Sequence, residues 1–167
     1  NAVVKNRYVG RTFINPTQSM RKMGIRIKLN PLKPVLSGKR VVVIDDSIVR
    51  GNTMKSLVGL LREAGAKEVH LRILSPPVSS PCFYGIDMDT KDQLIAANMS
   101  VDEISGWMHA DSLAYISLKG LLKCMPNAKH QTFCSACFDG NYPIEIPKPI
   151  SKNSFKTAKS FDKIYSK

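Results

Sequence analysis

Residues 41–53 read VVVIDDSIVRGNT, and this stretch decides the fold. Its first four residues, 41–44, are apolar and β-branched, as a strand buried on both faces of a sheet requires. Two acids, Asp45 and Asp46, follow at the point where that strand would end. A turn of small and hydroxyl-bearing residues then leads into a helical pattern, for which Thr53 can act as the N-cap.

The residues after this stretch predict a helix and a second strand. Apolar side chains fall on one helical face over residues 53–64, and Gly65 is a suitable residue to end that helix. Residues 69–74 alternate between apolar and polar and then reach two prolines, which predicts a strand. A strand–helix–strand unit of this kind favours parallel pairing, so the predicted fold class is α/β with a doubly wound parallel sheet.

Ligands of such sheets gather at the carboxyl ends of the strands, where Asp45 and Asp46 are expected. Amide groups at the start of a helix suit a phosphate, and carboxylates suit Mg²⁺ or the hydroxyls of a sugar. The turn between the acids and the helix is the right size for one phosphate. The pattern therefore predicts a site for a phosphorylated sugar.

The same stretch resembles the phosphoribosyl pyrophosphate (PRPP) motif of the type I phosphoribosyltransferases. With NRYVGRTFINPTQ at 6–18 and PCFYGIDM at 81–88, the resemblance narrows to the glutamine PRPP amidotransferases and covers residues 4–147. It implies part of a type I phosphoribosyltransferase sheet flanked by helices, followed by a helical and loop segment. It also implies Mg²⁺ at the acidic pair and PRPP bound by nine residues: Asp45, Asp46, Ser47, Ile48, Val49, Arg50, Gly51, Asn52 and Thr53.

The activity implied by this resemblance is the first committed step of purine synthesis. PRPP, glutamine and water give 5-phosphoribosylamine, pyrophosphate and glutamate. In this family a separate N-terminal glutaminase domain with a cysteine nucleophile supplies ammonia. Asn1 is no such nucleophile, so we expect a fragment that carries the C-terminal part of the transferase domain. Inhibition by purine nucleotides such as AMP and GMP, and assembly as a homo-oligomer, are further properties that the resemblance implies.

Residues 5–34 show little periodicity and contain three prolines, which predicts a long functional loop. The segment resembles the family's lid, which closes over bound PRPP and excludes water. Four basic side chains are candidates for contact with the departing pyrophosphate: Lys5, Arg11, Arg26 and Lys28. For each of them, a merely solvated side chain is the alternative.

The chain has four cysteines: Cys82, Cys124, Cys134 and Cys137. The CxxC pair at 134–137 alone is compatible with half a zinc site, a redox pair or chance. FCSACFDGNYP and PCFYGID, however, resemble cysteine segments of the iron–sulfur class of these amidotransferases. The resemblance implies Cys82, Cys134 and Cys137 as thiolate ligands of a 4Fe–4S cluster, with a fourth ligand upstream of this fragment. Zinc stays the alternative metal, and Cys124 is expected to pack as a small hydrophobe on an apolar helical face.

Three further helices are predicted after the second strand as packing elements. Thr90 can cap the first, and Ser100 with Glu103 forms a capping box for the second. Asp111 can cap the third, and His109 between them is expected to be structural. The third helix would bring four apolar side chains to the core: Leu113, Ile116, Leu121 and Leu122.

The formal net charge is +12, and its distribution favours a small anionic ligand. Residues 1–44 hold ten Lys or Arg and no Asp or Glu, which suits a phosphate and a pyrophosphate. The aromatic residues do not interleave with these charges, which argues against nucleic-acid binding. There is no signal peptide and no apolar run of membrane-spanning length, which predicts a cytoplasmic protein without membrane contact. The basic tail at 148–167 is predicted to be disordered.

Two other functions stay open at the level of sequence. A purine-salvage phosphoribosyltransferase would explain residues 41–53, but neither the cysteines nor the loop at 10–18. A non-catalytic regulator with a PRPP motif, or a basic module that binds nucleic acid, would keep the turn without needing the lid.

Overall fold

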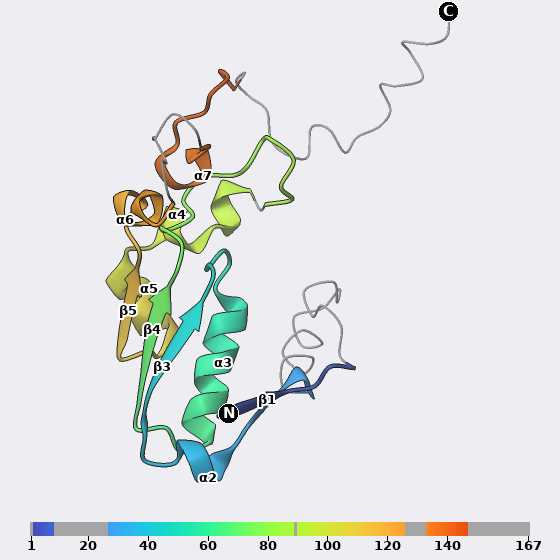
Figure 1. Ribbon diagram of the computed structural model, residues 1–167, viewed down its shortest axis with the longest axis vertical. Helices are drawn as coiled ribbons and strands as arrows, with labels where there is room; N and C mark the ends of the chain where they lie inside the picture. Colours follow the sequence, from blue (N-terminus) through green and yellow to red (C-terminus); the bar gives the residue numbers. More distant parts are fainter. Residues whose placement is uncertain (1, 9–26, 89, 126–132, 147–167) are drawn as a thin grey trace, which may run out of the picture.

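The computed structural model describes residues 2–8, 27–88, 90–125 and 133–146, and a three-stranded parallel sheet lies at its centre (Figure 1). The strands are β3 (Arg40–Asp45), β4 (Glu68–Ile73) and β5 (Ser112–Tyr115), in that order across the sheet. The register places Asp45 beside Ile73 and Ile73 beside Tyr115 at the carboxyl ends. The predicted α/β class with a parallel sheet is confirmed.

Helices α3 (Asn52–Glu63) and α5 (Val101–Met108) bury one face of this sheet. The core between them is aliphatic, and its most deeply buried members come from all three elements: Val58 and Leu61 of α3, Val69 and Leu71 of β4, and Ile104 and Met108 of α5. Each such side chain contributes about 1.5–3 kcal/mol by leaving water. The hydrophobic effect therefore fixes α3 and α5 against the strands and so positions the loops at their ends.

The strand predicted at 41–44 is present, but its predicted burial on both faces is wrong. Val42 is 59% exposed and Ile44 is 65% exposed, whereas Val41 and Val43 pack against the core. Successive side chains of a strand point to opposite faces. Nothing in the described ranges packs over the outer pair, so β3 is buried on one face only.

Helix α3 matches the predicted helix at 53–64, but Thr53 does not cap it. The N-cap position is Gly51, which has φ +78° and no side chain to offer. The buried face is shifted slightly from the predicted one, because Met54 and Val58 are buried and Leu57 only partly so. The predicted end is confirmed, since Gly65 follows the helix with φ +91°.

The third predicted helix is wrong at its start, because residues 112–115 form β5. Leu113 is buried and Ala114 is exposed, which is the two-residue period of a strand. The helix in this region is α6 (Leu118–Lys123). Its N-cap is Ser117, whose Oγ accepts a hydrogen bond from the Gly120 amide at 3.0 Å. Asp111 does not cap this helix; its carboxylate accepts hydrogen bonds from Arg62 and Val69, as described below.

The other short elements agree with the predictions only in part. The capping box of α5 is confirmed, with the Glu103 carboxylate 2.7 Å from the amide of Ser100. Thr90 stands at the N-cap of η2 (Lys91–Gln93), which precedes α4 (Ile95–Asn98), but its side chain makes no capping bond. His109 ends α5 in the left-handed conformation, with φ 58°, a structural position.

The segment predicted as an element-free loop at 5–34 contains secondary structure at both ends. β1 (Val3–Lys5) pairs antiparallel with β2 (Leu29–Pro31), and α2 (Lys33–Leu36) follows. Residues 9–26, which include Arg11 and Arg26, lie outside the described residues, as does the tail at 148–167. Within the described ranges, no helix is long and apolar enough to cross a membrane.

Helices α4, α6 and α7 (Ala136–Asp139) gather beyond the carboxyl ends of the strands, at the top of Figure 1. This end of the sheet is also where the β3–α3 turn lies. Both groups of predicted site residues, the PRPP motif and the cysteines, are therefore found on the same side of the sheet.

Asp111 joins the end of α3 to the start of β5. Its carboxylate accepts a hydrogen bond from the Val69 amide at 2.5 Å and one from Arg62 Nη2 at 2.6 Å. The Val69 bond is the main reason that the pKa of Asp111 is lowered, and Arg62 lowers it further. A lowered pKa means that the folded state holds the carboxylate more firmly than the unfolded state does.

We expect this contribution to stability to be complete above the unfolded pKa, about 3.9, and to be lost as the pH falls through the lower folded value. Asp111→Asn should lower the melting temperature at pH 6 and flatten its decline between pH 5 and pH 3. Thermal unfolding at the two ends of that range tests this. An equal decline in Asp111→Asn and the parent protein would contradict it.

Candidate functional site

The two acids of the motif lie together at the carboxyl end of β3. The Asp46 amide donates to Asp45 Oδ1 at 3.1 Å, and Ser47 Oγ donates to Asp46 Oδ1 at 3.0 Å. Both acids are exposed. Partial desolvation of the carboxyl at the strand end raises the pKa of Asp45, the hydrogen bond from the Asp46 amide lowers it, and the charge of Asp46 raises it. Two adjacent carboxylates that repel one another form a site where a cation would be stabilising.

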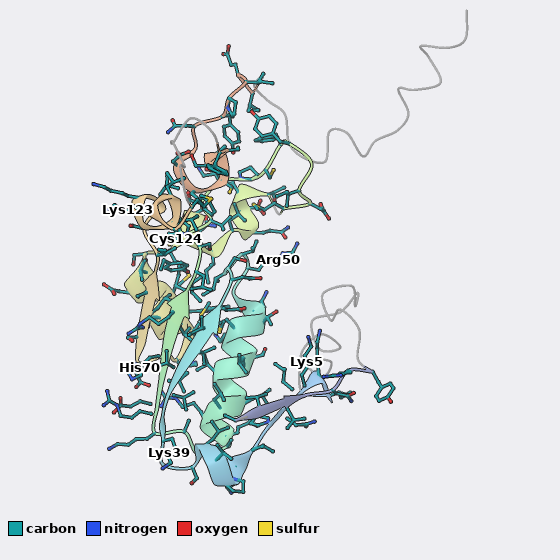
Figure 2. The ribbon with its side chains drawn as sticks, viewed as in Figure 1. Lys5, Lys39, Arg50, His70, Lys123 and Cys124 are labelled. Atoms are coloured by element: carbon teal, nitrogen blue, oxygen red, sulfur yellow. The ribbon has the colours of Figure 1, made fainter. Side chains whose placement is uncertain are left out.

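The turn after the acids is fixed to the body of the protein by its middle residues. Ile48 is 2% exposed, so its side chain is an anchor in the core. The Val49 carbonyl accepts a hydrogen bond from the Ile95 amide at 3.0 Å, which ties the turn to α4. Figure 2 shows Arg50 at the turn between β3 and α3, and its side chain is exposed.

Gly51 is the point of closest approach between the turn and the rest of the fold. A Cβ at this position would lie 2.8 Å from Met108 Cε and 2.9 Å from Ile95 Cδ1. Residues that have a Cβ also rarely adopt the φ of +78° found at Gly51. The positive φ is the main reason for glycine here, since the Met108 and Ile95 atoms are the free ends of side chains that can shift. Neither Met108 nor Ile95 carries a sequence signal that reveals the contact.

Helix α3 begins directly after Gly51 with an open N-terminus. Its first bond runs from the Lys55 amide to the Gly51 carbonyl at 2.9 Å, so the amides of Asn52 and Thr53 have no helical carbonyl to bond. The N-cap glycine provides no side-chain acceptor. The helix dipole adds positive potential at this end, which is the arrangement that binds phosphate groups.

The structure thus brings the nine predicted motif residues, 45–53, into one turn with acids on one side and helix amides on the other. Of the lid candidates, Lys5 is the last residue of β1, and Lys28 directly precedes β2. The Asn6 amide donates to the Lys28 carbonyl at 2.7 Å, and β2 packs against α3. Figure 2 shows Lys5 on β1.

The three predicted cluster ligands come from two segments that lie side by side. Burial raises the pKa of the Cys137 thiol, and the nearby thiolates of Cys82 and Cys134 raise it further. All four cysteines are free thiols. Cys124 does not pack as a small hydrophobe, because it is exposed at the C-cap of α6, past the helix's apolar face.

These thiols fit a soft metal by their chemistry, since iron–sulfur clusters are held by cysteine thiolates. Within the described ranges, however, no three cysteine, histidine or acidic side chains are close enough together to hold a metal ion. Cys82, Cys134 and Cys137 are thus neighbours rather than an assembled ligand set. A four-thiolate site would need them to close up and one further ligand to join them.

Comparison with known proteins identifies a matching family model, relatives and solved structures. Residues 3–76 match the family model of the phosphoribosyl transferase domain. Amidophosphoribosyltransferases from Synechocystis sp. and Synechococcus elongatus are 60% and 62% identical over 152 and 151 residues, which is 90% of this chain. The chain is homologous to the amidophosphoribosyltransferases. It spans only 30% of the length of these two relatives.

Solved structures of this family agree. The chain superimposes with a TM-score of 0.76 on glutamine PRPP amidotransferase from B. subtilis complexed with ADP and GMP, at 50% identity over 90% of this chain and 34% of that one. A second structure, of the allosteric regulatory enzyme of purine biosynthesis, gives a TM-score of 0.75 and 51% identity over 90% of this chain and 33% of that one. The amidophosphoribosyltransferase resemblance seen in the sequence is confirmed.

The positive φ and close packing at Gly51 lead to a stability test with a matched control. Gly51→Ala should lower the free energy of unfolding by about 1–3 kcal/mol, chiefly through the strained φ, with the ends of the Met108 and Ile95 side chains displaced. Gly59 lies in the middle of α3, and a Cβ at this position would have nothing within 4 Å. Gly59→Ala should therefore raise the free energy of unfolding by about 0.5–1 kcal/mol.

Urea unfolding of both variants makes the comparison. If the two substitutions changed stability in the same direction, the close approach of the turn to α5 would be contradicted.

Proposed function

We propose that this chain is the PRPP-binding part of an amidophosphoribosyltransferase, which converts PRPP, glutamine and water to 5-phosphoribosylamine, pyrophosphate and glutamate. The observation that carries the proposal is the pairing of two exposed acids with an open helix N-terminus across one turn, in a chain 60% identical to a named amidophosphoribosyltransferase. Its relatives are about three times as long, so the complete reaction belongs to the longer protein.

In this proposal the β3–α3 turn holds the sugar phosphate. The amides of Asn52 and Thr53 bond the 5′-phosphate, and the hydroxyls of Ser47 and Thr53 add neutral donors. Asp45 and Asp46 orient the ribose hydroxyls and bind Mg²⁺, which when bound neutralises charge on the departing pyrophosphate. Ammonia then attacks C1 of the ribose as the bond from C1 to pyrophosphate breaks.

Several groups must act around this turn. Lys5 and Lys28, with Arg11 and Arg26, meet the pyrophosphate from the lid side and exclude water, which would otherwise hydrolyse the activated sugar. Ammonia comes from glutamine on a glutaminase domain of the longer protein. Purine nucleotides compete for the same phosphate turn, a proposal supported by the ADP and GMP complex of the B. subtilis relative. The working form is a cytoplasmic homo-oligomer.

The alternatives have less support. A purine-salvage enzyme would share the family model at 3–76, but the 50–62% identity to proteins named amidophosphoribosyltransferase extends over about 150 residues and includes the cysteine segments. The long match also leaves no separate role for a nucleic-acid-binding module.

The acidic pair provides the decisive test of the activity. In the full-length protein, the double variant Asp45→Asn/Asp46→Asn should reduce PRPP- and ammonia-dependent phosphoribosylamine formation by about 100-fold or more, and abolish its dependence on Mg²⁺. Asp102→Asn is the matched control, since Asp102 is an exposed acid on α5. Unchanged turnover in the double variant would reject the site.

We also propose that Cys82, Cys134 and Cys137 bind a 4Fe–4S cluster with a fourth ligand from the longer protein. When bound, such a cluster has a structural role, because it joins the segments that carry its ligands. Anaerobically purified full-length protein should contain about four irons per chain and absorb visible light. Cys137→Ser should lose both properties, whereas Cys124→Ser should keep them. A colourless protein that contains zinc would contradict the cluster.

A further inference from the structure

The two segments that carry the cysteines are joined by a set of hydrogen bonds independent of any metal. The amides of Ser79 and Ser80 both donate to the Cys137 carbonyl, at 3.0 and 3.1 Å. Ser79 Oγ donates to the Phe138 carbonyl at 3.1 Å. These bonds fix the chain two to three residues before Cys82 against the first turn of α7.

Tyr142 makes a second connection between the two segments, because it contacts the residues on both sides of Cys82. Its hydroxyl donates to the Pro81 carbonyl at 2.7 Å, directly before the cysteine. Its ring packs edge-on against Phe83, directly after the cysteine, with centroids 5.2 Å apart and planes at 63°. The Tyr84 ring lies 6.2 Å away, and the Tyr84 hydroxyl bonds the backbone of Ile144. One half-buried tyrosine therefore contacts the residues that flank Cys82.

The electrostatics agree with this placement. Burial is the largest cause that raises the pKa of Tyr142; a hydrogen bond with the Ser80 side chain lowers it, and the charges of Cys137 and Cys82 raise it. Tyr142 thus lies near ligands from both segments.

We propose that Tyr142 is a positioning residue for Cys82, which it holds beside Cys134 and Cys137 before a metal binds. The inference rests on the proposed function only in treating the three cysteines as one ligand set. Beyond Cys82 the chain continues as an exposed loop at 84–87. Without Tyr142, the nearest remaining ties before the cysteine are Ser79 and Ser80, so the thiol would move over a wider range.

The test uses the full-length protein with Cys124→Ser, which removes the exposed fourth thiol of this chain. Tyr142→Phe deletes the hydrogen bonds of the hydroxyl with Pro81 and Ser80 and keeps the ring, and Tyr142→Leu deletes the hydrogen bonds and the ring. Tyr115→Phe is the matched hydroxyl control, because the Tyr115 hydroxyl is buried and has no hydrogen-bond partner in the described ranges. In reduced, chelator-treated protein, the bridging of Cys82 to Cys134 or Cys137 by dibromobimane is followed by fluorescence and peptide mass spectrometry.

We expect bridging to be about fivefold slower in Tyr142→Phe, as the loss of the hydrogen bond to Pro81 implies. Tyr142→Leu should be slower still, and Tyr115→Phe unchanged. Iron per chain after anaerobic reconstitution should fall in the same order. Bridging in Tyr142→Phe at the rate of the parent would overturn the inference, and this variant decides alone if circular dichroism shows Tyr142→Leu to be unfolded. Bridging that depends on Tyr142 in a protein that takes up no iron would support the positioning role and reject the cluster.

Discussion

The geometry of the site depends on the contact between Gly51 and helix α5. The φ of +78° favours glycine at this point, and the absence of a Cβ lets the turn lie directly against the side-chain ends of Met108 and Ile95. The hydrogen bond from the Ile95 amide to the Val49 carbonyl strengthens the same contact. The shape of a turn encoded at residues 45–53 is thus set by α4 and α5, which come more than 40 residues later.

This dependence connects the two groups of functional residues. The chain runs from Cys82 through the loop at 84–88 to η2 and α4, and α4 bonds the turn that we propose binds PRPP. The Cys82 segment is therefore connected by a short stretch of chain to the helix that supports the phosphate turn, and hydrogen bonds join it to the Cys137 segment. Residues 79–84 are thus connected to Val49 by the chain that leads to α4 and by the hydrogen bond from the Ile95 amide.

The strand, helix and strand at 40–73 could be predicted because residues 41–44 are an unbroken β-branched run, the helix and the second strand show their own periods, and Gly65 and the prolines after Leu74 mark the ends. β5 could not, because Asp111 resembles an N-cap and only four residues, 112–115, show the two-residue period. The role of Asp111 as an acceptor for Val69 depends on β4, which sequence spacing does not reveal. The acidic pair and the helix start were predictable because they adjoin in sequence, whereas the seat of Gly51 and the contacts of Tyr142 join segments far apart.

The outer face of β3 has a practical consequence for handling this segment. Val42 and Ile44 are more than half exposed, and β3 is an edge of the sheet formed by the described strands. An edge strand with bare apolar side chains is a template on which other chains can add strands, which leads to self-association. A solution of the isolated 167-residue chain should therefore become increasingly polydisperse as it is concentrated, and a longer version that covers these two side chains should stay monodisperse.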